Sequence, residues 1–292
     1  MTVNQIFISV LCLLTGLFGF GCNRSFEANP TTQTSQQQPA TSSNPPDTGN
    51  EDPVNVMDHI DPKAFTQILL FNGRGISTSD WQSTEQIVQS MNLSYRLVNS
   101  AALSAFTLEE LKNFGLILIP GGNSNTINNG LSIETRIRVR QAVRDGGVSY
   151  LGICAGAFAG VGTDTASNTT AHYGFAVALG EYLSFWYPNG NSSKLAAVPL
   201  TSFADGSKRY LTWYGGPGTP EWKNGVIARY PDGRAAISQT WTQNALVILS
   251  GVHPEAPSSW QSDSGPDPDG LDHDIAVKLI RAALEKKALP VF

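Results

Sequence analysis

A cysteine between two glycines, in Gly-Ile-Cys-Ala-Gly at 152–156, is the stretch of this sequence best suited to covalent chemistry. The β-branched and aromatic run at 148–153 predicts a buried strand that ends at the cysteine. Gly152 and Gly156 have no Cβ, so a strand and a following helix can pass close together around Cys154. The pattern predicts a nucleophile elbow, with cysteine in place of serine. The helix N-terminus beside the sulfur would favour the thiolate.

A second apolar strand offers the base that a cysteine nucleophile needs. Residues 245–250 predict a buried strand that runs into Gly-Val-His-Pro-Glu at 251–255. In an extended segment, residues i and i+2 point the same way, so Glu255 can hold the imidazole of His253. The bland alternatives are a surface histidine at a turn and a buried, unreactive cysteine. We predict that Cys154 is the nucleophile, His253 its base and Glu255 the acid that orients the base.

Acyl transfer also needs hydrogen-bond donors for the oxyanion that forms on the attacked carbonyl. The N–H of Ala155 follows the nucleophile directly. The N–H of Gly122, beyond a fully apolar strand at 116–119, is the predicted second donor. A simple turn would explain the glycine pair equally well.

Charge and composition argue against several other kinds of site. The net charge of −5 gives no electrostatic basis for binding nucleic acid. The four histidines and three cysteines lack the spacing of zinc sites. Gly73-Arg74-Gly75 follows a strand, but the third glycine of a dinucleotide fingerprint is missing. We therefore expect neither a cofactor nor a metal ion.

The N-terminal part of the sequence predicts export. Residues 6–20 are mostly apolar, short for a membrane span and of the right length for a signal peptide. They are followed by Cys22, after a small residue, which resembles a bacterial lipoprotein signal. The sequence departs from the usual lipoprotein pattern in two ways. Gly19 stands where an aliphatic residue usually lies, three positions before the cysteine, and residues 1–5 contain no Lys or Arg. We expect a signal peptide at 1–22 ending at a lipidated Cys22, with an ordinary signal peptide or an uncleaved anchor as alternatives.

Residues 23–60 are rich in Ser, Thr, Gln and Pro and have few large apolar side chains. Such a composition cannot bury enough surface to offset the entropy of ordering, so we expect a disordered tether. The tether would hold the remaining domain, 61–292, away from the membrane. The predicted location is extracytoplasmic, lipid-anchored to a bacterial membrane on its periplasmic or cell-surface side.

Strands alternate with helices through the first half of 61–292, which predicts an α/β fold with a mostly parallel, doubly wound sheet. In such sheets, sites lie beyond the carboxyl ends of the strands. Further expected elements are strands at 67–71 and 95–98, helices at 80–91, from a cap at Ser132 to Gly146, and at 274–289, a helix carrying Leu108, Leu111 and Phe114 behind a Thr107–Glu110 capping box, and a hairpin of 226–230 with 235–238.

Five motifs of the sequence are Phe-Asn-Gly-x-Gly at 71–75, Ile-Pro-Gly-Gly at 119–122, Tyr-Leu-Gly-Ile-Cys-Ala-Gly-Ala at 150–157, Tyr-Gly-Gly at 214–216 and Ser-Gly-Val-His-Pro-Glu at 250–255. Together they resemble the class I glutamine amidotransferase-like superfamily, and within it the domain named for the N-terminal region of eukaryotic biotin–protein ligase. The resemblance implies a flavodoxin-like three-layer sandwich and, by position, a Cys154–His253–Glu255 triad. It implies neither biotin transfer nor glutamine hydrolysis here, because the sequence shows no ligase or synthase domain.

Three functional hypotheses follow from these residues. The first is a thiol-dependent amidase or acyl-transfer hydrolase that acts on an unknown small amide, ester or peptide-like substrate. The second is a non-catalytic ligand-binding lipoprotein on the same fold. The third is a cysteine-elbow α/β-hydrolase, which would need Asp205 or Asp232 as its acid and would make Glu255 dispensable. The sequence does not predict the substrate or the oligomeric state.

Overall fold

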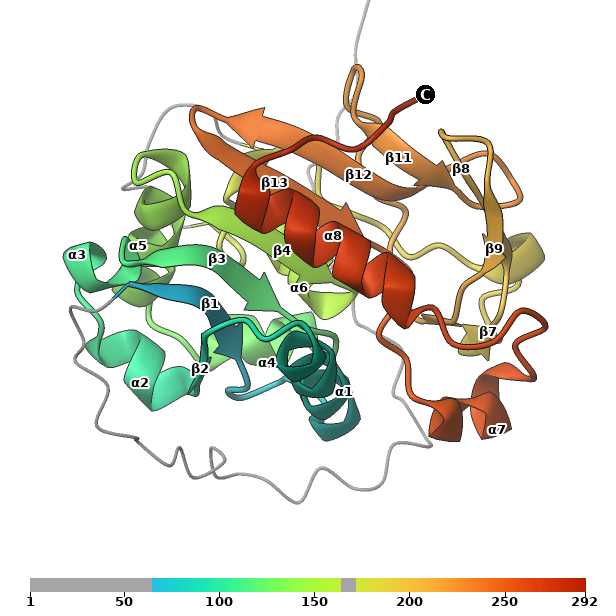
Figure 1. The fold of residues 1–292 in the computed structure, drawn as a ribbon, viewed down its shortest axis with the longest axis horizontal. Coiled ribbons are helices and arrows are strands. Elements are labelled where there is room, and N and C mark those ends of the chain that lie inside the picture. The colour runs from blue at the N-terminus through green and yellow to red at the C-terminus, as the bar shows by residue number, and fades with distance from the viewer. Residues whose placement is uncertain (1–64, 164–171) are drawn as a thin grey trace, which may run out of the picture. The chain divides into compact units, whose positions relative to one another are not determined.

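A mixed sheet organises the protein in the computed structural model, which describes residues 65–163 and 172–292 (Figure 1). The predicted signal peptide, the tether and Cys22 lie outside these residues. Within them, nine strands form the sheet in the order β2-β1-β3-β4-β13-β12-β11-β8-β9. The first five strands run parallel: β2 (Tyr95–Val98), β1 (Thr66–Phe71), β3 (Phe114–Ile119), β4 (Ser149–Ile153) and β13 (Ala245–Ser250).

The other strands extend the sheet in an antiparallel manner from β13. They are β12 (Ala235–Thr242), β11 (Val226–Arg229), β8 (Leu200–Phe203) and β9 (Lys208–Tyr210). The predicted hairpin is present as β11 and β12. The parallel order 2-1-3-4 with β13 in fifth place is that of flavodoxin-like sheets, so the predicted fold class is confirmed.

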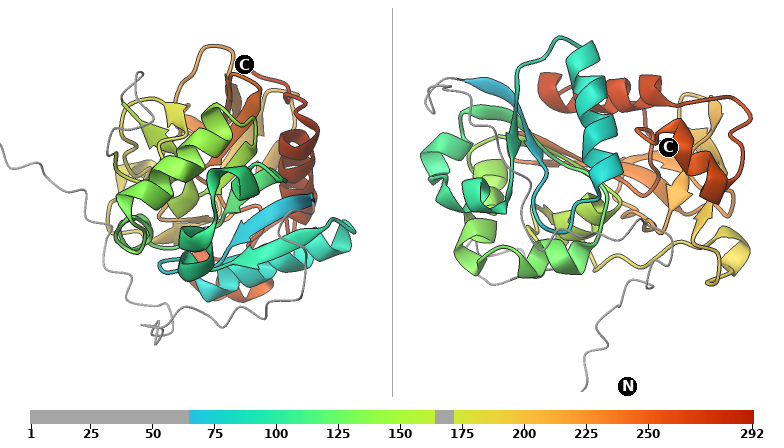
Figure 2. Two further views of the ribbon diagram at one scale, coloured as in Figure 1. Left: turned by 90° about the vertical axis from the view of Figure 1, so that its left-hand side faces the viewer. Right: turned by 90° about the horizontal axis from the view of Figure 1, so that it is seen from below.

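The helices form a layer on each side of the sheet, because the strands are apolar on both faces. Alternate residues of β1 show this: Ile68 and Leu70 pack into one core, Leu69 and Phe71 into the other. One layer holds α1 (Thr78–Ser90) and α8 (His273–Glu285); the other holds α2 (Ser100–Ala105), α3 (Leu108–Leu111), α4 (Ser124–Asn129), α5 (Ile133–Arg144) and α6 (Ala155–Gly160). Figure 2 shows α8 and α5 on opposite sides of the strands.

Besides the sheet and its two helix layers, the described residues form several short elements. These are β5 (Val161–Gly162) with β6 (Ala178–Leu179), β7 (Ala196–Ala197) with β10 (Trp213–Tyr214), the 3-10 turns η1 (Pro188–Gly190) and η2 (Ser258–Trp260), and α7 (Gln261–Ser264).

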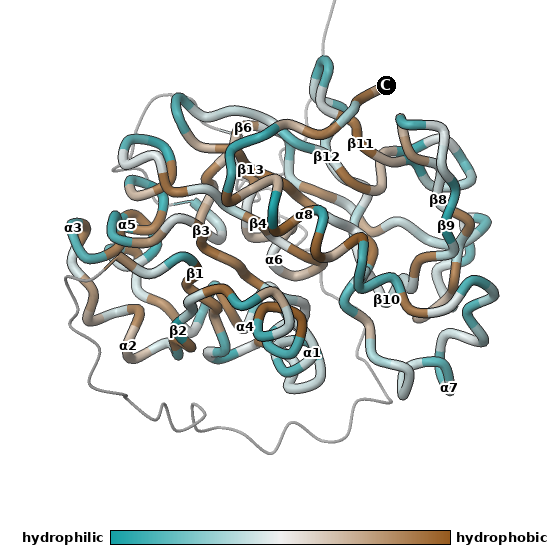
Figure 3. Tube along the Cα trace, in the orientation of Figure 1, coloured by the Kyte–Doolittle hydropathy of each residue, from teal (hydrophilic) through white to brown (hydrophobic). Residues whose placement is uncertain are grey.

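Figure 3 shows the central strands mostly as hydrophobic and the region around α7 mostly as hydrophilic. Among the described helices, none is long and apolar enough to cross a membrane.

Some expected boundaries were wrong. The capping box of Thr107 and Glu110 is present, but α3 lasts one turn and Phe114 instead begins β3, where it pairs with Thr66 of β1. The last helix ends at Glu285 rather than 289, because Lys286 adopts a left-handed conformation (φ 51°) that closes it. The short helices α2 and α4 were not predicted, since neither has a long apolar repeat.

Candidate active site

Parallel strands carry the predicted residues to one edge of the sheet. Cys154 follows β4 and His253 comes three residues after β13. These two strands are direct neighbours, with Ser250 paired to Ile153 at their carboxyl ends. Gly122 lies beyond the end of β3, the neighbour of β4 on its other side. The sheet order therefore explains why residues far apart in the sequence meet at this edge.

The backbone of Cys154 makes the sharp turn that the flanking glycines predict. Its φ of 48° and ψ of −102° lie outside the regions that L-residues prefer, a conformation that persists only where the surroundings enforce it. A Cβ on Gly152 would lie 2.4 Å from the Gly156 oxygen, and one on Gly156 would lie 2.1 Å from the Ile119 oxygen. The cysteine N–H donates to the Ser250 oxygen at 2.8 Å, which anchors the turn to β13.

The sulfur of Cys154 is not exposed. The residue is 2% accessible, forms no disulfide with any described residue, and its Sγ donates to the Tyr214 oxygen at 3.6 Å. Tyr214 packs against Trp260, whose ring lies 5.0 Å from the His253 ring. These two partly exposed aromatic side chains thus stand beside the candidate nucleophile and base.

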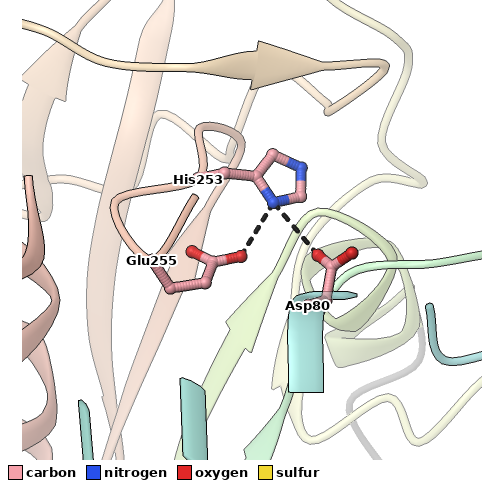
Figure 4. A group of neighbouring side chains, drawn as sticks. All are labelled: Asp80, His253 and Glu255. Carbon is pink, nitrogen blue, oxygen red and sulfur yellow. Dashed lines mark hydrogen bonds and ion pairs between the residues drawn. The ribbon is translucent and has the colours of Figure 1, made fainter. Parts of the chain in front are cut away.

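His253 and Glu255 form a buried pair. His253 Nδ1 lies 2.8 Å from Glu255 Oε1, and both residues are 2% exposed or less (Figure 4). The backbone N–H of His253 donates to the Thr212 oxygen at 2.7 Å. The hydroxyl of Ser83, on α1, donates to the main-chain oxygen of Glu255. The turn is therefore fixed on two sides, and Nδ1 faces the carboxylate as predicted.

A second carboxylate, Asp80, faces the same imidazole nitrogen, and the sequence did not reveal it. Asp80 Oδ1 lies 3.2 Å from His253 Nδ1, and the residue is 2% exposed (Figure 4). Asp80 lies in the first turn of α1, where an acidic residue ordinarily indicates helix capping. Helix capping accounts for an acidic residue at this place in the sequence, so the position offers no reason to expect another role. The contact with His253 joins distant parts of the chain, and no local pattern reports it.

The electrostatics of the group follow from burial and these contacts. Burial alone would lower the pKa of His253, but the charge of Glu255, the charge of Cys154 and the contact with Asp80 together raise it well above the ordinary value. Burial raises the pKa of Glu255 and the negative charge of Asp80 adds to this rise, against the opposing effect of His253. Cys154 and His253 follow the paired ends of β4 and β13, which places both at the same edge of the sheet. Nε2 makes no hydrogen bond with a described residue.

The two predicted oxyanion donors follow β4 and β3, the next two strands of the sheet beyond β13. Ala155 is the first residue of α6, a position whose N–H has no partner within the helix. Gly122 forms an antiparallel bridge with Ile76, and its φ of 149° suits glycine. A Cβ on the preceding Gly121 would lie 2.6 Å from His253 Cε1, so the glycine turn contacts the imidazole. Oxyanion binding by either N–H stays a prediction.

Asp80, His253 and Glu255 also come closest to a metal-ligand arrangement among the described residues, with one ligand atom of each within 4.8 Å of the others. A metal ion would need the lone pair of Nδ1, whereas a hydrogen bond to Glu255 needs a proton there. The 2.8 Å contact with Oε1 is a normal hydrogen-bond length and accounts for the arrangement. We therefore interpret the group as hydrogen-bonded rather than metal-binding.

The acids required by the α/β-hydrolase hypothesis have other partners. Asp205 pairs with Lys278 at 2.9 Å. Asp232 pairs with Arg234 and accepts from the Trp186 indole, both at 2.9 Å. Glu255, which that hypothesis makes dispensable, is the residue at His253. These contacts argue against the third hypothesis.

Several solved structures are similar to this chain at low sequence identity. A search of curated proteins finds no match. Solved structures similar to this chain include a glutamine amidotransferase with 16% identity and a TM-score of 0.48, covering 74% of this chain and 99% of that one. Another is a glutamine amidotransferase from Thermotoga maritima, with 12% identity and a TM-score of 0.46, covering 75% and 95%.

A family model gives a more direct comparison. The model described as "Biotin-protein ligase, N terminal" matches residues 66–170. The matched region contains the elbow and the glycine turn, whereas His253 and Glu255 lie beyond it. The match shows that residues 66–170 are similar to the N-terminal region of biotin–protein ligase.

Proposed function

We propose that this protein is a thiol-dependent amidase or related acyl-transfer hydrolase. One observation carries the proposal: Cys154 occupies a strained strand-to-helix turn at the same sheet edge as a buried imidazole, which is itself hydrogen-bonded to a carboxylate. A cysteine nucleophile needs this set of groups, and a cysteine that only fills a core needs neither the strain nor the charged neighbours. The glutamine amidotransferase-like fold supports the general class.

The first half of the proposed reaction forms an acyl-enzyme. Because the neighbours of His253 favour its charged form, the imidazolium holds the proton and Cys154 attacks as the thiolate. A carbon–sulfur bond forms, and the carbonyl electrons move to an oxyanion that the N–H groups of Ala155 and Gly122 would bind. When the intermediate collapses, the bond to the leaving amine or alkoxide breaks and the imidazolium gives it a proton.

The second half releases the acid product. Neutral His253 takes a proton from water, and the resulting hydroxide attacks the thioester. Collapse of this second intermediate breaks the carbon–sulfur bond and returns the thiolate beside the imidazolium. Glu255 keeps the ring in place and stabilises its charge in both halves.

We also propose that the domain works outside the cytoplasm, attached through a lipid on Cys22. The support is the apolar run that ends at Cys22 and the polar sequence of 23–60. The proposed reaction transfers the acyl group to water, so the protein would need no partner enzyme that accepts ammonia at this location.

Incubation of the full chain with libraries of small amides and esters tests the proposal. We expect at least one class to be hydrolysed, with loss of turnover in Cys154→Ala and in His253→Gln. A covalent acyl-enzyme adduct on Cys154, seen by intact mass during turnover, would identify the nucleophile. Saturable binding without any turnover would instead favour the ligand-binding lipoprotein.

A further inference from the structure

We propose that Asp80 is a second carboxylate partner of His253, which acts with Glu255 to hold the imidazole in one orientation and in its charged form. Asp80 is thereby a positioning residue, because it acts through His253. The proposal rests on the proposed function for the purpose of His253. It is carried by the position of one ring nitrogen between two buried carboxylates, at 2.8 and 3.2 Å (Figure 4).

The helix that carries Asp80 does not need this carboxylate for capping. An acidic residue three positions after an N-cap ordinarily accepts a hydrogen bond from the N-cap N–H. In α1 the N-cap is Ser77, and its N–H donates to the Gly121 oxygen at 3.1 Å. The local partner of Asp80 is therefore already taken, and its carboxylate turns toward His253 instead.

The chain makes room for this contact. A Cβ on Gly121 would lie 2.1 Å from Asp80 Oδ1 and 2.6 Å from His253 Cε1. No real side chain approaches so closely, so the glycine is required wherever the pair takes this position. Two further contacts bind α1 to the segment that follows β13: Ser83 donates to the Glu255 oxygen, and the Trp260 indole donates to Ser79 Oγ at 3.2 Å.

The balance of charge gives Asp80 a consequence beyond packing. Three titratable groups face His253: Glu255 from its own turn, Asp80 from α1 and Cys154 from the elbow. The aromatic ring of Trp260 contributes no charge, and the Tyr230 hydroxyl, near Cys154, donates to the Pro217 oxygen. Two carboxylates beside one nitrogen favour a positive imidazole more than Glu255 does alone.

The titration of His253 tests this directly, and it can be followed by NMR in the full chain labelled at histidine. His253→Gln identifies the signal among the four histidines. Asp80→Asn keeps the shape of the side chain and removes its charge, so the midpoint of His253 should move down. Glu255→Gln should move it down further, because Oε1 is closer. Asp80→Glu, which keeps the charge, should retain more of the raised midpoint than Asp80→Asn does.

The control is Glu85→Gln. Glu85 lies on the same helix, and its carboxylate accepts from the Tyr95 hydroxyl instead of His253. This substitution removes the same charge from α1 and should leave the His253 midpoint in place. A shift in Asp80→Asn no larger than that in Glu85→Gln would overturn the proposal. A midpoint at or below 6.5 in the wild-type chain would overturn it without any variant.

The two proposals can fail separately. If Cys154 turns over a substrate but Asp80→Asn leaves the His253 titration unchanged, the assignment of Asp80 is wrong and the hydrolase stands. If the titration shifts as expected but no substrate forms an adduct with Cys154, Asp80 is confirmed as a partner of His253 and the hydrolase fails.

Discussion

Glu255 Oε1 lies 2.8 Å from His253 Nδ1, and neither side chain reaches solvent. We predict that Glu255→Gln lowers the hydrolysis rate by roughly 10²-fold, in the range of general acid–base contributions. Glutamine keeps the shape but removes the charge that stabilises the imidazolium. Steady-state kinetics on a substrate found by library screening would measure the loss. Glu109→Gln, which changes an exposed carboxylate paired with Lys112, should have no effect.

The elbow glycines give a prediction about stability. Gly156 lies in α6, where helix propensity alone would make alanine stabilising by about 1 kcal/mol. We instead expect Gly156→Ala to destabilise the fold by about 1–3 kcal/mol, because its Cβ would press against the Ile119 oxygen. Urea unfolding measures the difference. Gly218→Ala is the control, since a Cβ there meets no atom within 4 Å; an equal loss in both variants would contradict the elbow packing.

The raised pKa of His253 predicts how stability depends on pH. Burial opposes the shift, but Glu255, Cys154 and Asp80 outweigh it, so the folded chain binds the proton more tightly than the unfolded chain. The stabilisation is fully present below pH 6.5 and is lost as the pH rises through the folded pKa. The pKa of Glu255 is raised as well, in this case mainly by burial, so the folded chain also binds this proton more tightly than the unfolded chain does. The stability linked to this proton therefore falls as the pH rises above 4.5.

Denaturant unfolding of wild type and His253→Gln at a series of pH values above 6.5 checks this sign. The free energy of unfolding of the wild type should exceed that of His253→Gln most at the lowest pH of the series, and the difference between the two should narrow as the pH rises. A gap that widens with pH would show that His253 is buried in its neutral form.

The anchor prediction concerns Cys22, outside the described residues. Wild-type chain should fractionate with membranes and carry a lipid adduct on a mature chain that starts at Cys22. Intact mass after detergent extraction would show the adduct. Cys22→Ser should lose both properties, whereas equal membrane association of this variant would contradict lipidation.

Patterns local in the sequence predicted most of the fold and part of the site. The elbow was accessible because two glycines and a preceding apolar run act within a few residues of Cys154, and the pairing of His253 with Glu255 follows from a spacing of two. The capping box at Thr107 is also a local pattern and was predicted correctly, but the predicted helix behind it was too long. Phe114 pairs with the distant Thr66 in the sheet instead of continuing the helix, and no local signal reports such a contact.

Asp80 shows the same limit at the candidate site. Its sequence context, Ser-Thr-Ser-Asp at 77–80, is that of a helix start, and α1 does begin there. Two contacts that depend on the tertiary fold determine which group its carboxylate faces. The Ser77 N–H donates to the Gly121 oxygen instead of to Asp80, and the segment after β13 brings His253 to the carboxylate. The hydrogen bond from Cys154 Sγ to the Tyr214 oxygen likewise joins distant segments, and no local pattern reports it.

The reactivity of Cys154 tests the central claim most directly. The native full chain is treated with an iodoacetamide probe at neutral pH, and peptide mass spectrometry follows the rate of labelling at Cys154 apart from Cys12 and Cys22. A thiolate held beside an imidazolium should react faster in the native chain than in the urea-unfolded chain, despite its burial, and His253→Gln should remove this advantage. If native Cys154 reacts more slowly than the unfolded residue and His253→Gln leaves its rate unchanged, Cys154 is a structural residue and the hydrolase is contradicted.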